Sequence, residues 1–320
     1  MRDIPPELLN GPFTRAQAIA RGATPRMLRG RRFVRVHPRV WRHRDHAMTP
    51  DDHVLAAALA LPPDARTTGV TRIQQLGLDF GPRTPVRFVV SRDLHLDLDG
   101  VFLHRTARMP PLDAVGVAPV AAFVSYCSLA RTVDAIKVGD WLLHEHHMEW
   151  DELHQFALEN LWRDGAEEAL WILGLLDGDS RSLRESETRA LLHFAGLPAP
   201  EVNTGAVAPD DATRIADLVY RSWGVVVEYE GAHHQVDRAQ YVKDIDRYSS
   251  LRRAAVPYVQ VTKEKLARPR RLVLEVYDAL VAQGYDGTPP EFGEQWRHLF
   301  ARVSDVVAAR RRWSRVATRR

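Results

Sequence analysis

Two carboxylates and two histidines follow three valines in the stretch VVVEYEGAHHQ, residues 225–235. The valines have the β-branched composition of a buried strand. Glu228 and Glu230 stand at the end of this strand, just before a glycine and the histidine pair. Burying a charge is costly unless the charge is paired or binds a metal. The stretch therefore predicts a strand that leaves the core at a site with a charged or metallic partner.

A short turn, RSWG, separates this strand from the preceding segment TRIADLVY. We expect Arg221 and Gly224 to close the turn and to set an antiparallel register. That register places Asp217 directly opposite Glu228, with Cβ atoms about 5 Å apart on one face. Glu230 shares a face with Glu228 because side chains alternate along a strand. The pattern predicts three carboxylates on one patch of a small sheet.

Three carboxylates this close repel one another unless a cation lies among them. Hard oxygen ligands in this number are typical of Mg²⁺ or Mn²⁺ sites. Such ions activate water and stabilise the developing charge in phosphate chemistry, so the patch predicts a divalent-metal site. The same residues allow an alternative, a network of ion pairs that would perturb the carboxylates in a similar way. Its candidate arginines are Arg214, Arg221, Arg247 and Arg252.

The elements that would hold this site follow the order helix, three strands, helix, strand, helix. Hydrophobic periodicity and stop signals predict them. They are a helix in SLRESETRALLHFAGLP, strands at 201–207, in TRIADLVY and in VVVEYE, a helix carrying Tyr241 to Leu251, a strand in PYVQVT and a helix from 270 to 283. One further helix, with Phe292, Trp296, Phe300, Val303 and Val307, leads to a basic tail.

The N-terminal 45 residues predict a small helical DNA-binding unit. Thr14 and Gln17 have the spacing of a capping box, and Thr24 before Pro25 begins a second helix. Strand-like residues follow from Phe33, so the order is helix, turn, helix and hairpin, as in a winged helix-turn-helix. The helix-turn-helix could instead serve only to pack against protein. The residues expected to contact DNA are Arg26 and Arg29 on the second helix and Arg31, Arg32 and Arg35 on the wing.

Charge is concentrated at the two ends of the 320-residue chain, although the formal net charge is only +3. Residues 1–45 hold eleven arginines against three acids, and the last eleven residues hold six arginines. Clustered cations of this kind favour a polyanionic partner, here DNA. Solubility together with arginine-rich codon usage is the alternative explanation.

The remaining composition indicates a globular protein of the cytoplasm. Hydrophobic residues make up 45% of the chain, and no apolar run reaches the length of a membrane span. The single cysteine, Cys127, excludes an internal disulfide and fits a small buried side chain. Residues 46–180 predict an α+β middle domain with helices near 50–61 and 69–77, two paired strands at 85–91 and 100–106, and helices from about 118 to 178.

The C-terminal pattern resembles the PD-(D/E)XK nuclease fold, and it is most similar to Vsr-like (very-short-patch-repair-like) domains of actinobacterial proteins. The resemblance covers about residues 182–266. The matching residues are Glu185 and Ser186 before AGLP, then Arg214, Asp217, Glu228, Glu230, Gly231, His234, Asp244, Arg247, and VT at Val261 and Thr262. The segments FTRAQAIARGA, VHPRVWR and ARTVDA resemble the AbiEi antitoxin family.

This resemblance implies roles for individual residues. Asp217 and Glu228 would hold the metal, with the Tyr229 carbonyl as a third ligand. Glu185 would hold a metal-bound water, and His234 would lie at the edge of the site as a proton donor or a phosphate contact.

One departure from the nuclease pattern bears on activity. Glu230 stands where the general pattern has lysine, which helps to orient the attacking water and stabilises charge in the transition state. Lys243 is the nearby substitute among only four lysines. Ala216 and Gln260 also differ from the pattern, at positions where the fold tolerates change.

The predicted fold class is therefore multi-domain α/β, and its domains are a winged helix-turn-helix at 1–45, an antitoxin-like α+β domain at 46–180, a PD-(D/E)XK nuclease-like domain with a small mixed sheet flanked by helices at 181–285, and a C-terminal helix with a basic tail at 286–320. The predicted function is that of a Mg²⁺- or Mn²⁺-dependent DNA endonuclease. The alternative is an antitoxin-like DNA-binding regulator whose nuclease-fold domain is weak or inactive. A toxin or other protein partner and the oligomeric state stay open.

Overall fold

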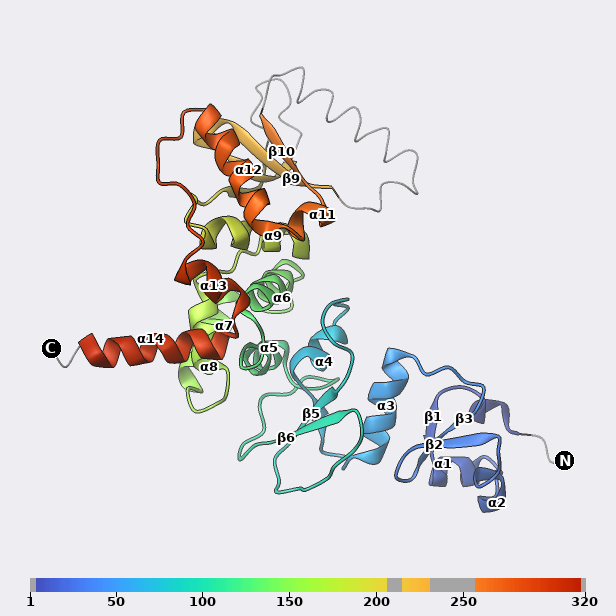
Figure 1. Cartoon of the computed structure of the whole chain (residues 1–320). Coiled ribbons are helices and arrows are strands. Elements are labelled where there is room, and N and C mark those ends of the chain that lie inside the picture. Colours follow the sequence, from blue (N-terminus) through green and yellow to red (C-terminus); the bar gives the residue numbers. More distant parts are fainter. Residues whose placement is uncertain (1–3, 206–214, 231–256, 318–320) are drawn as a thin grey trace, which may run out of the picture. The chain divides into compact units, whose positions relative to one another are not determined.

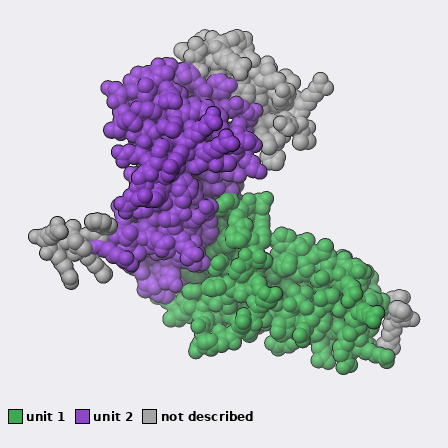
Figure 2. All heavy atoms as spheres, in the orientation of Figure 1, with its two compact units in different colours: residues 1–122 green, residues 123–320 purple. Residues whose placement is uncertain are grey.

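The computed structural model describes residues 4–205, 215–230 and 257–317 (Figure 1). The chain is a mixed α/β protein, and its described strands form three small sheets. It divides into two compact units, residues 1–122 and residues 123–320 (Figure 2). The predicted domain boundaries near residues 45 and 180 fall inside these units, so they stay predictions.

The N-terminal elements follow the predicted order of helix, turn, helix and hairpin. They are the 3-10 helix η1 Pro6–Leu8, β1 Pro12–Thr14, α1 Arg15–Ala20, α2 Pro25–Leu28, β2 Phe33–His37 and β3 Val40–His43. The predicted capping box of Thr14 and Gln17 begins α1, and the Thr24 side chain caps α2. β3 pairs antiparallel with β1 and β2. The helices and strands share a hydrophobic core that includes Phe33.

A second sheet follows in the same unit, with two helices beside it. The elements are α3 Pro50–Ala60, β4 Arg66–Thr67, α4 Gly69–Gln74, β5 Val86–Val90 and β6 Val101–Arg105. The predicted pairing of β5 with β6 is confirmed, and it is parallel. β4, which the sequence did not predict, pairs antiparallel with β5. Buried Arg72 of α4 donates from Nε to the Val117 carbonyl at 3.1 Å and pairs with Asp113, so it fixes the loop after β6.

Helices fill the first half of the second unit, as predicted. They are α5 Pro119–Cys127, α6 Thr132–His144, α7 Trp150–Glu159 and α8 Ala166–Leu173. α6 packs against α9, Leu183–Phe194, through a buried ion pair. Arg189 donates from Nη2 to Asp140 Oδ2 at 2.8 Å, and the Asp140 side chain is fully buried. This contact holds α9, which carries Glu185, on the preceding helices.

The third sheet has the strand order β10-β9-β8-β7. Its strands are β7 Glu201–Gly205, β8 Ile215–Tyr220, β9 Val225–Tyr229 and β10 Tyr258–Val261, followed by α11 Lys263–Leu266 and α12 Pro269–Ala282. β7, β8 and β9 are antiparallel neighbours, whereas β10 is parallel to β9. The small mixed sheet and the helix near 270–283 agree with the prediction. The predicted helix from Tyr241 to Leu251 lies outside the described residues.

The single helix predicted from Phe292 onward is wrong. Two helices, α13 Glu294–Phe300 and α14 Val303–Ala317, take its place. Between them Ala301 is extended, with φ −78° and ψ 162°. Its carbonyl accepts from the Thr132 N–H at 2.9 Å, and the Val303 N–H donates to the Ala130 carbonyl at 3.0 Å. This pairing with the start of α6 interrupts a helix that periodicity alone would continue.

Among the described helices, none combines the length and the apolar character that a membrane span requires. Cys127 at the end of α5 is fully buried, as the sequence analysis predicted for this small side chain.

Candidate functional site

The hairpin of β8 and β9 has the predicted register. Leu218 pairs with Val227, Val219 with Val226, and Tyr220 with Val225. A 3-10 turn, η2 Arg221–Trp223, joins the strands, and Gly224 closes it with φ +64°. Continued by one step beyond the paired residues, this register would bring Asp217 level with Glu228, the pair that the sequence predicts. The two carboxylates therefore leave neighbouring strands at one level of the sheet.

The same level carries a polar residue on each of the four strands. In the β7–β8 pair, Val202 faces Leu218 and Thr204 faces Ala216, which places Asn203 beside Asp217. In the β9–β10 pair, Glu228 faces Gln260. Asn203, Asp217, Glu228 and Gln260 thus cross the sheet as one line, which we name the polar row. The sequence had singled out the two carboxylates and noted Gln260, but it missed Asn203.

Asp217 and Glu228 occupy different environments within the polar row. The Asp217 carboxylate accepts a hydrogen bond from the Tyr229 N–H, at 2.7 Å to Oδ2. This bond ties the carboxylate to the end of β9, next to the Tyr229 carbonyl that was predicted as a ligand. Glu228 is only 4% exposed. A carboxylate buried to this extent requires compensating interactions, and a divalent cation is one group that supplies them.

Glu185 reaches the polar row from α9. It is 7% exposed, and its Oε2 accepts from the Arg181 N–H at 2.9 Å and from Asn203 Nδ2 at 2.8 Å. Asn203 has a left-handed backbone with φ +46°, and its Nδ2 also donates to the Asp179 carbonyl at 2.6 Å. Among the described residues, none donates to the other Glu185 oxygen, Oε1. Within the described residues, protein donors therefore fix one oxygen of this carboxylate.

The alternative explanation of the carboxylates as arginine ion pairs can be followed at Arg221. Its guanidinium binds Glu201 at the start of β7 through three contacts of 2.7 to 2.9 Å. This ion pair holds the pKa of Glu201 below its ordinary value. Arg214, Arg247 and Arg252 lie outside the described residues. Arg221 is thus engaged with Glu201 at the hairpin end of the sheet.

Three further predicted site residues have different outcomes. His234 and Lys243 lie outside the described residues. Glu230 follows β9, and its N–H donates to the Val261 carbonyl at 2.8 Å, so its backbone is fixed between β9 and β10. In the described ranges, no three His, Cys, Asp or Glu side chains are grouped closely enough to hold a metal ion. The expectation of three converging carboxylates is therefore not met within those ranges.

The predicted DNA-contacting arginines are displayed on the N-terminal unit. Arg26, Arg29, Arg31 and Arg35 are exposed, and Arg32 is half-buried. None of the four exposed guanidiniums forms an ion pair with a carboxylate in the described part of the chain. Guanidiniums that are exposed and not paired with a carboxylate are available to phosphates.

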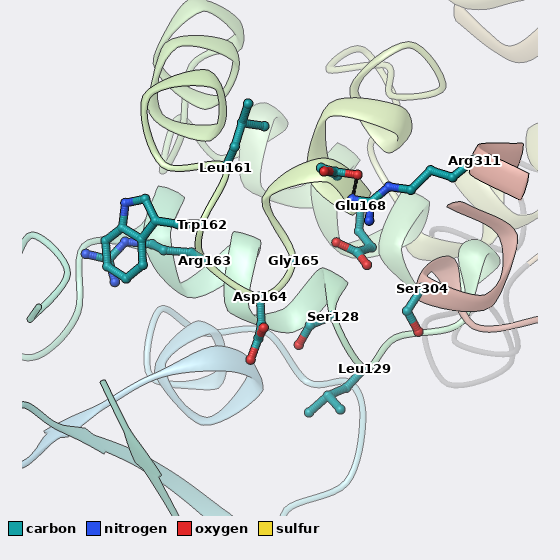
Figure 3. A pocket seen from close by; sticks show the side chains of 11 residues that line it. Ser128, Leu129, Leu161, Trp162, Arg163, Asp164, Gly165, Glu168, Ser304 and Arg311 are labelled. Carbon is teal, nitrogen blue, oxygen red and sulfur yellow. Dashed lines mark ion pairs between the residues drawn. The ribbon is translucent and has the colours of Figure 1, made fainter. Parts of the chain in front are cut away.

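A separate hollow of about 470 Å³ lies in the second unit, where the loop between α7 and α8 meets α14 (Figure 3). Ser128, Asp164 and Ser304 border it, and Arg311 of α14 pairs with Glu167 beside it (Figure 3). No residue of the polar row lines this hollow. It is therefore distinct from the predicted metal site.

No profile of a known protein family matches the chain, and no solved structure matches it. The chain is 23% identical over 181 residues to two uncharacterized proteins of Mycobacterium tuberculosis, MT2308 of strain CDC 1551 / Oshkosh and Rv2248 of strain ATCC 25618 / H37Rv. The match covers 55% of this chain and 67% of each relative. The resemblance to Vsr-like and AbiEi-like proteins stays a prediction.

Proposed function

We propose that this protein is a metal-dependent DNA endonuclease that hydrolyses phosphodiester bonds at the polar row. The observation that carries the proposal is the β8–β9 register, which, continued by one step, brings Asp217 level with buried Glu228. A strand interior seldom contains two adjacent carboxylates without a functional reason, because the charges repel and their burial is costly.

The residues of the polar row fit Mg²⁺ or Mn²⁺ as a two-carboxylate site. Asp217 and Glu228 would hold the ion, and the Tyr229 carbonyl, one residue further along β9, would supply a third hard oxygen. When bound, the ion would activate water and neutralise charge on the phosphate. Glu185, held by Asn203, would orient a water through its remaining oxygen. His234 and Lys243, in the segment after β9, are the proposed proton donor and lysine substitute.

The N-terminal unit would place this site on DNA. Its helix, turn, helix and hairpin arrangement fits a winged helix-turn-helix, in which one helix reads base edges and the hairpin touches phosphates. Arg26 of the short helix α2, Arg29 at its C-cap rather than on the helix as predicted, and Arg31, Arg32 and Arg35 near the hairpin would supply the cations. The exposure of all of these except half-buried Arg32 supports a contact with DNA over a role in packing.

Plasmid nicking tests the proposal. The full chain is incubated with supercoiled DNA and Mg²⁺ or Mn²⁺, beside the isosteric variants Asp217→Asn and Glu228→Gln. Both should lose activity by about a hundredfold or more, the scale expected when transition-state charge stabilisation is removed. Glu201→Gln, in the same sheet but paired with Arg221, is the matched control and should retain activity. Nicking that persists in both Asp217→Asn and Glu228→Gln would contradict the proposed mechanism.

A second candidate function is favoured by one residue. Glu230 brings a negative charge to the position where a nuclease of this type would have lysine, and this supports an antitoxin-like DNA-binding regulator with a weak or inactive nuclease-fold domain. For this candidate the wild type should retain DNA in a salt-sensitive manner without nicking it. Adding Mg²⁺ or Mn²⁺ should then leave the DNA uncleaved and the affinity of the protein for DNA unchanged.

A further inference from the structure

A basic pocket lies at the base of the N-terminal hairpin, at the opposite end from its turn. Its volume is about 560 Å³, within the range of small-molecule sites. Arg31 and Arg32, just before β2, line it together with His43 and Arg44 at the end of β3. The hairpin turn, where Arg39 has φ +65°, is at the far end of both strands. The pocket is therefore separate from the wing tip.

The charge of the lining selects an anion. Among the described residues that line it, three carry guanidiniums, whereas one, Asp45, carries a carboxylate. The Asp45 side chain is 84% exposed and lies 3.9 Å from His43 Nδ1, so it is partly turned to solvent. Arg31 and Arg44 are exposed and have no ion pair within the described residues. A phosphate group matches the donor geometry of clustered guanidiniums.

The backbone around the pocket is organised before any ligand arrives. Arg42 Nη1 donates to the carbonyls of His43, Arg44 and His46 at 3.0, 2.7 and 2.7 Å. The Arg44 N–H donates to the Arg32 carbonyl at 2.8 Å, which closes the base of the hairpin. The Arg31, Arg32 and Arg44 side chains thus start from a fixed frame, and this reduces the entropy that binding must overcome.

The pocket also has an apolar wall. Ile4 and Leu9, on either side of η1, complete the lining, and Leu9 is 38% exposed. An inorganic anion gains nothing from such a wall, whereas the sugar and base of a nucleotide would bury apolar surface against it. The combination of guanidiniums and apolar side chains points to a phosphate ester.

We infer that this pocket binds the phosphate ester of a nucleotide. Two sources share that chemistry, a free mononucleotide and a nucleotide within a DNA strand. The DNA source rests on the proposed function, whereas the mononucleotide source does not. Neither source involves Asp217 or Glu228, so the pocket can be tested apart from cleavage.

Calorimetric titration of the full chain without divalent metal tests both sources. One arm uses deoxyadenosine monophosphate, with inorganic phosphate as the comparison, and the other uses a short DNA duplex. The test variant is Arg44→Ala, because Arg31 is also a proposed DNA contact. The control is Arg108→Ala, which removes the same charge from an exposed position of the same unit. The Kd in at least one arm should rise about tenfold or more in the test variant and stay unchanged in the control.

Each outcome assigns or rejects the pocket. A loss of mononucleotide affinity in the test variant assigns the free nucleotide as ligand, and a loss confined to the duplex assigns DNA. Unchanged affinity in both arms overturns the inference, as does an equal loss in the control. Inorganic phosphate that binds as tightly as the mononucleotide overturns the role of Ile4 and Leu9. Since no step requires nicking, an inactive nuclease site leaves these readings intact.

Discussion

The side-chain amide of Asn203 donates a hydrogen bond to the carboxylate of Glu185, with 2.8 Å between Nδ2 and Oε2. This bond joins β7 to α9 and fixes the rotation of the Glu185 carboxyl group. Asn203 can hold this position because its left-handed backbone, with φ +46°, is one that asparagine tolerates. Asn203 is thus a positioning residue for Glu185 in the proposed nuclease.

Replacing Asn203 should affect turnover more than binding. Asn203→Gly keeps the left-handed backbone accessible and removes the amide, so the Arg181 N–H alone should hold the Glu185 carboxyl group and its orientation should be less fixed. We expect kcat for plasmid nicking to fall about tenfold to a hundredfold, with KM for DNA unchanged, because positioning groups act on orientation. The Mg²⁺ concentration that gives half of the maximal nicking rate should increase as well. If thermal stability falls together with kcat while the Mg²⁺ dependence of the rate is unaltered, Asn203 has a structural role only.

The buried Asp140 predicts a dependence of stability on pH. Burial raises its pKa from 3.8 to about 6, and the contacts with Arg189 and the Asp177 N–H offset this only in part. The folded protein therefore binds a proton more tightly at Asp140 than the unfolded chain does. The stability that Asp140 contributes should be present below pH 4 and should be lost as the pH rises toward 6.

Denaturant unfolding of the wild type and of Asp140→Asn checks this sign. The free energy of unfolding of the wild type, relative to the variant, should decrease between pH 4 and pH 6 and level off above that window. The difference between the two proteins removes the contribution of the other carboxylates. A difference that is constant with pH would mean that folding does not raise the pKa of Asp140.

Much of the third sheet could be predicted because short stretches of neighbouring residues determine its strands and the β8–β9 register. The hairpin of β8 and β9 has a short turn whose closing residues set the register, so the level shared by Asp217 and Glu228 followed from counting residues. Asn203 could not be found in this way, because residues 206–214 separate β7 from β8 and a longer connection leaves the register open. The break at Ala301 depends on the distant segment 130–132, which no local pattern reveals. Tertiary pairing overrides helical periodicity at that point.

Gly165 should be intolerant of any side chain. Its φ is +93°, and a Cβ atom there would lie 1.9 Å from the Val124 carbonyl oxygen. Gly165→Ala should therefore destabilise the protein by about 3 kcal/mol or more, through backbone strain and overpacking. Gly174→Ala is the matched control at the other end of α8, where φ is −69° and an added Cβ atom would meet no other part of the described chain within 4 Å. Equal unfolding temperatures for the two variants would reject this packing of α8 on α5.

The α2 arginines should govern the salt dependence of DNA binding. Arg26→Ala with Arg29→Ala removes two exposed cations from the proposed recognition helix. If both contact phosphates, the slope of log affinity against log salt should decrease by about 2, and if they read base edges, sequence preference should relax instead. Fluorescence anisotropy with a labelled duplex measures both. Arg83→Ala with Arg108→Ala is the charge-matched control, and equal slopes in the two double variants would place the DNA contact elsewhere.

Glu230 decides between the two proposed functions. Its backbone N–H is fixed by the Val261 carbonyl, so a substitution changes the charge at the end of β9 while the strand pairing is kept. Glu230→Lys would add a cation near the scissile phosphate in place of an anion, where charge stabilisation has its largest effect. In a nuclease weakened by Glu230, the rate of plasmid nicking should rise about tenfold or more. Glu230→Gln separates removal of the negative charge from addition of the positive charge, since only the latter can supply the lysine function. A rate that stays at background in both variants, with DNA binding and folding intact, would favour the regulator.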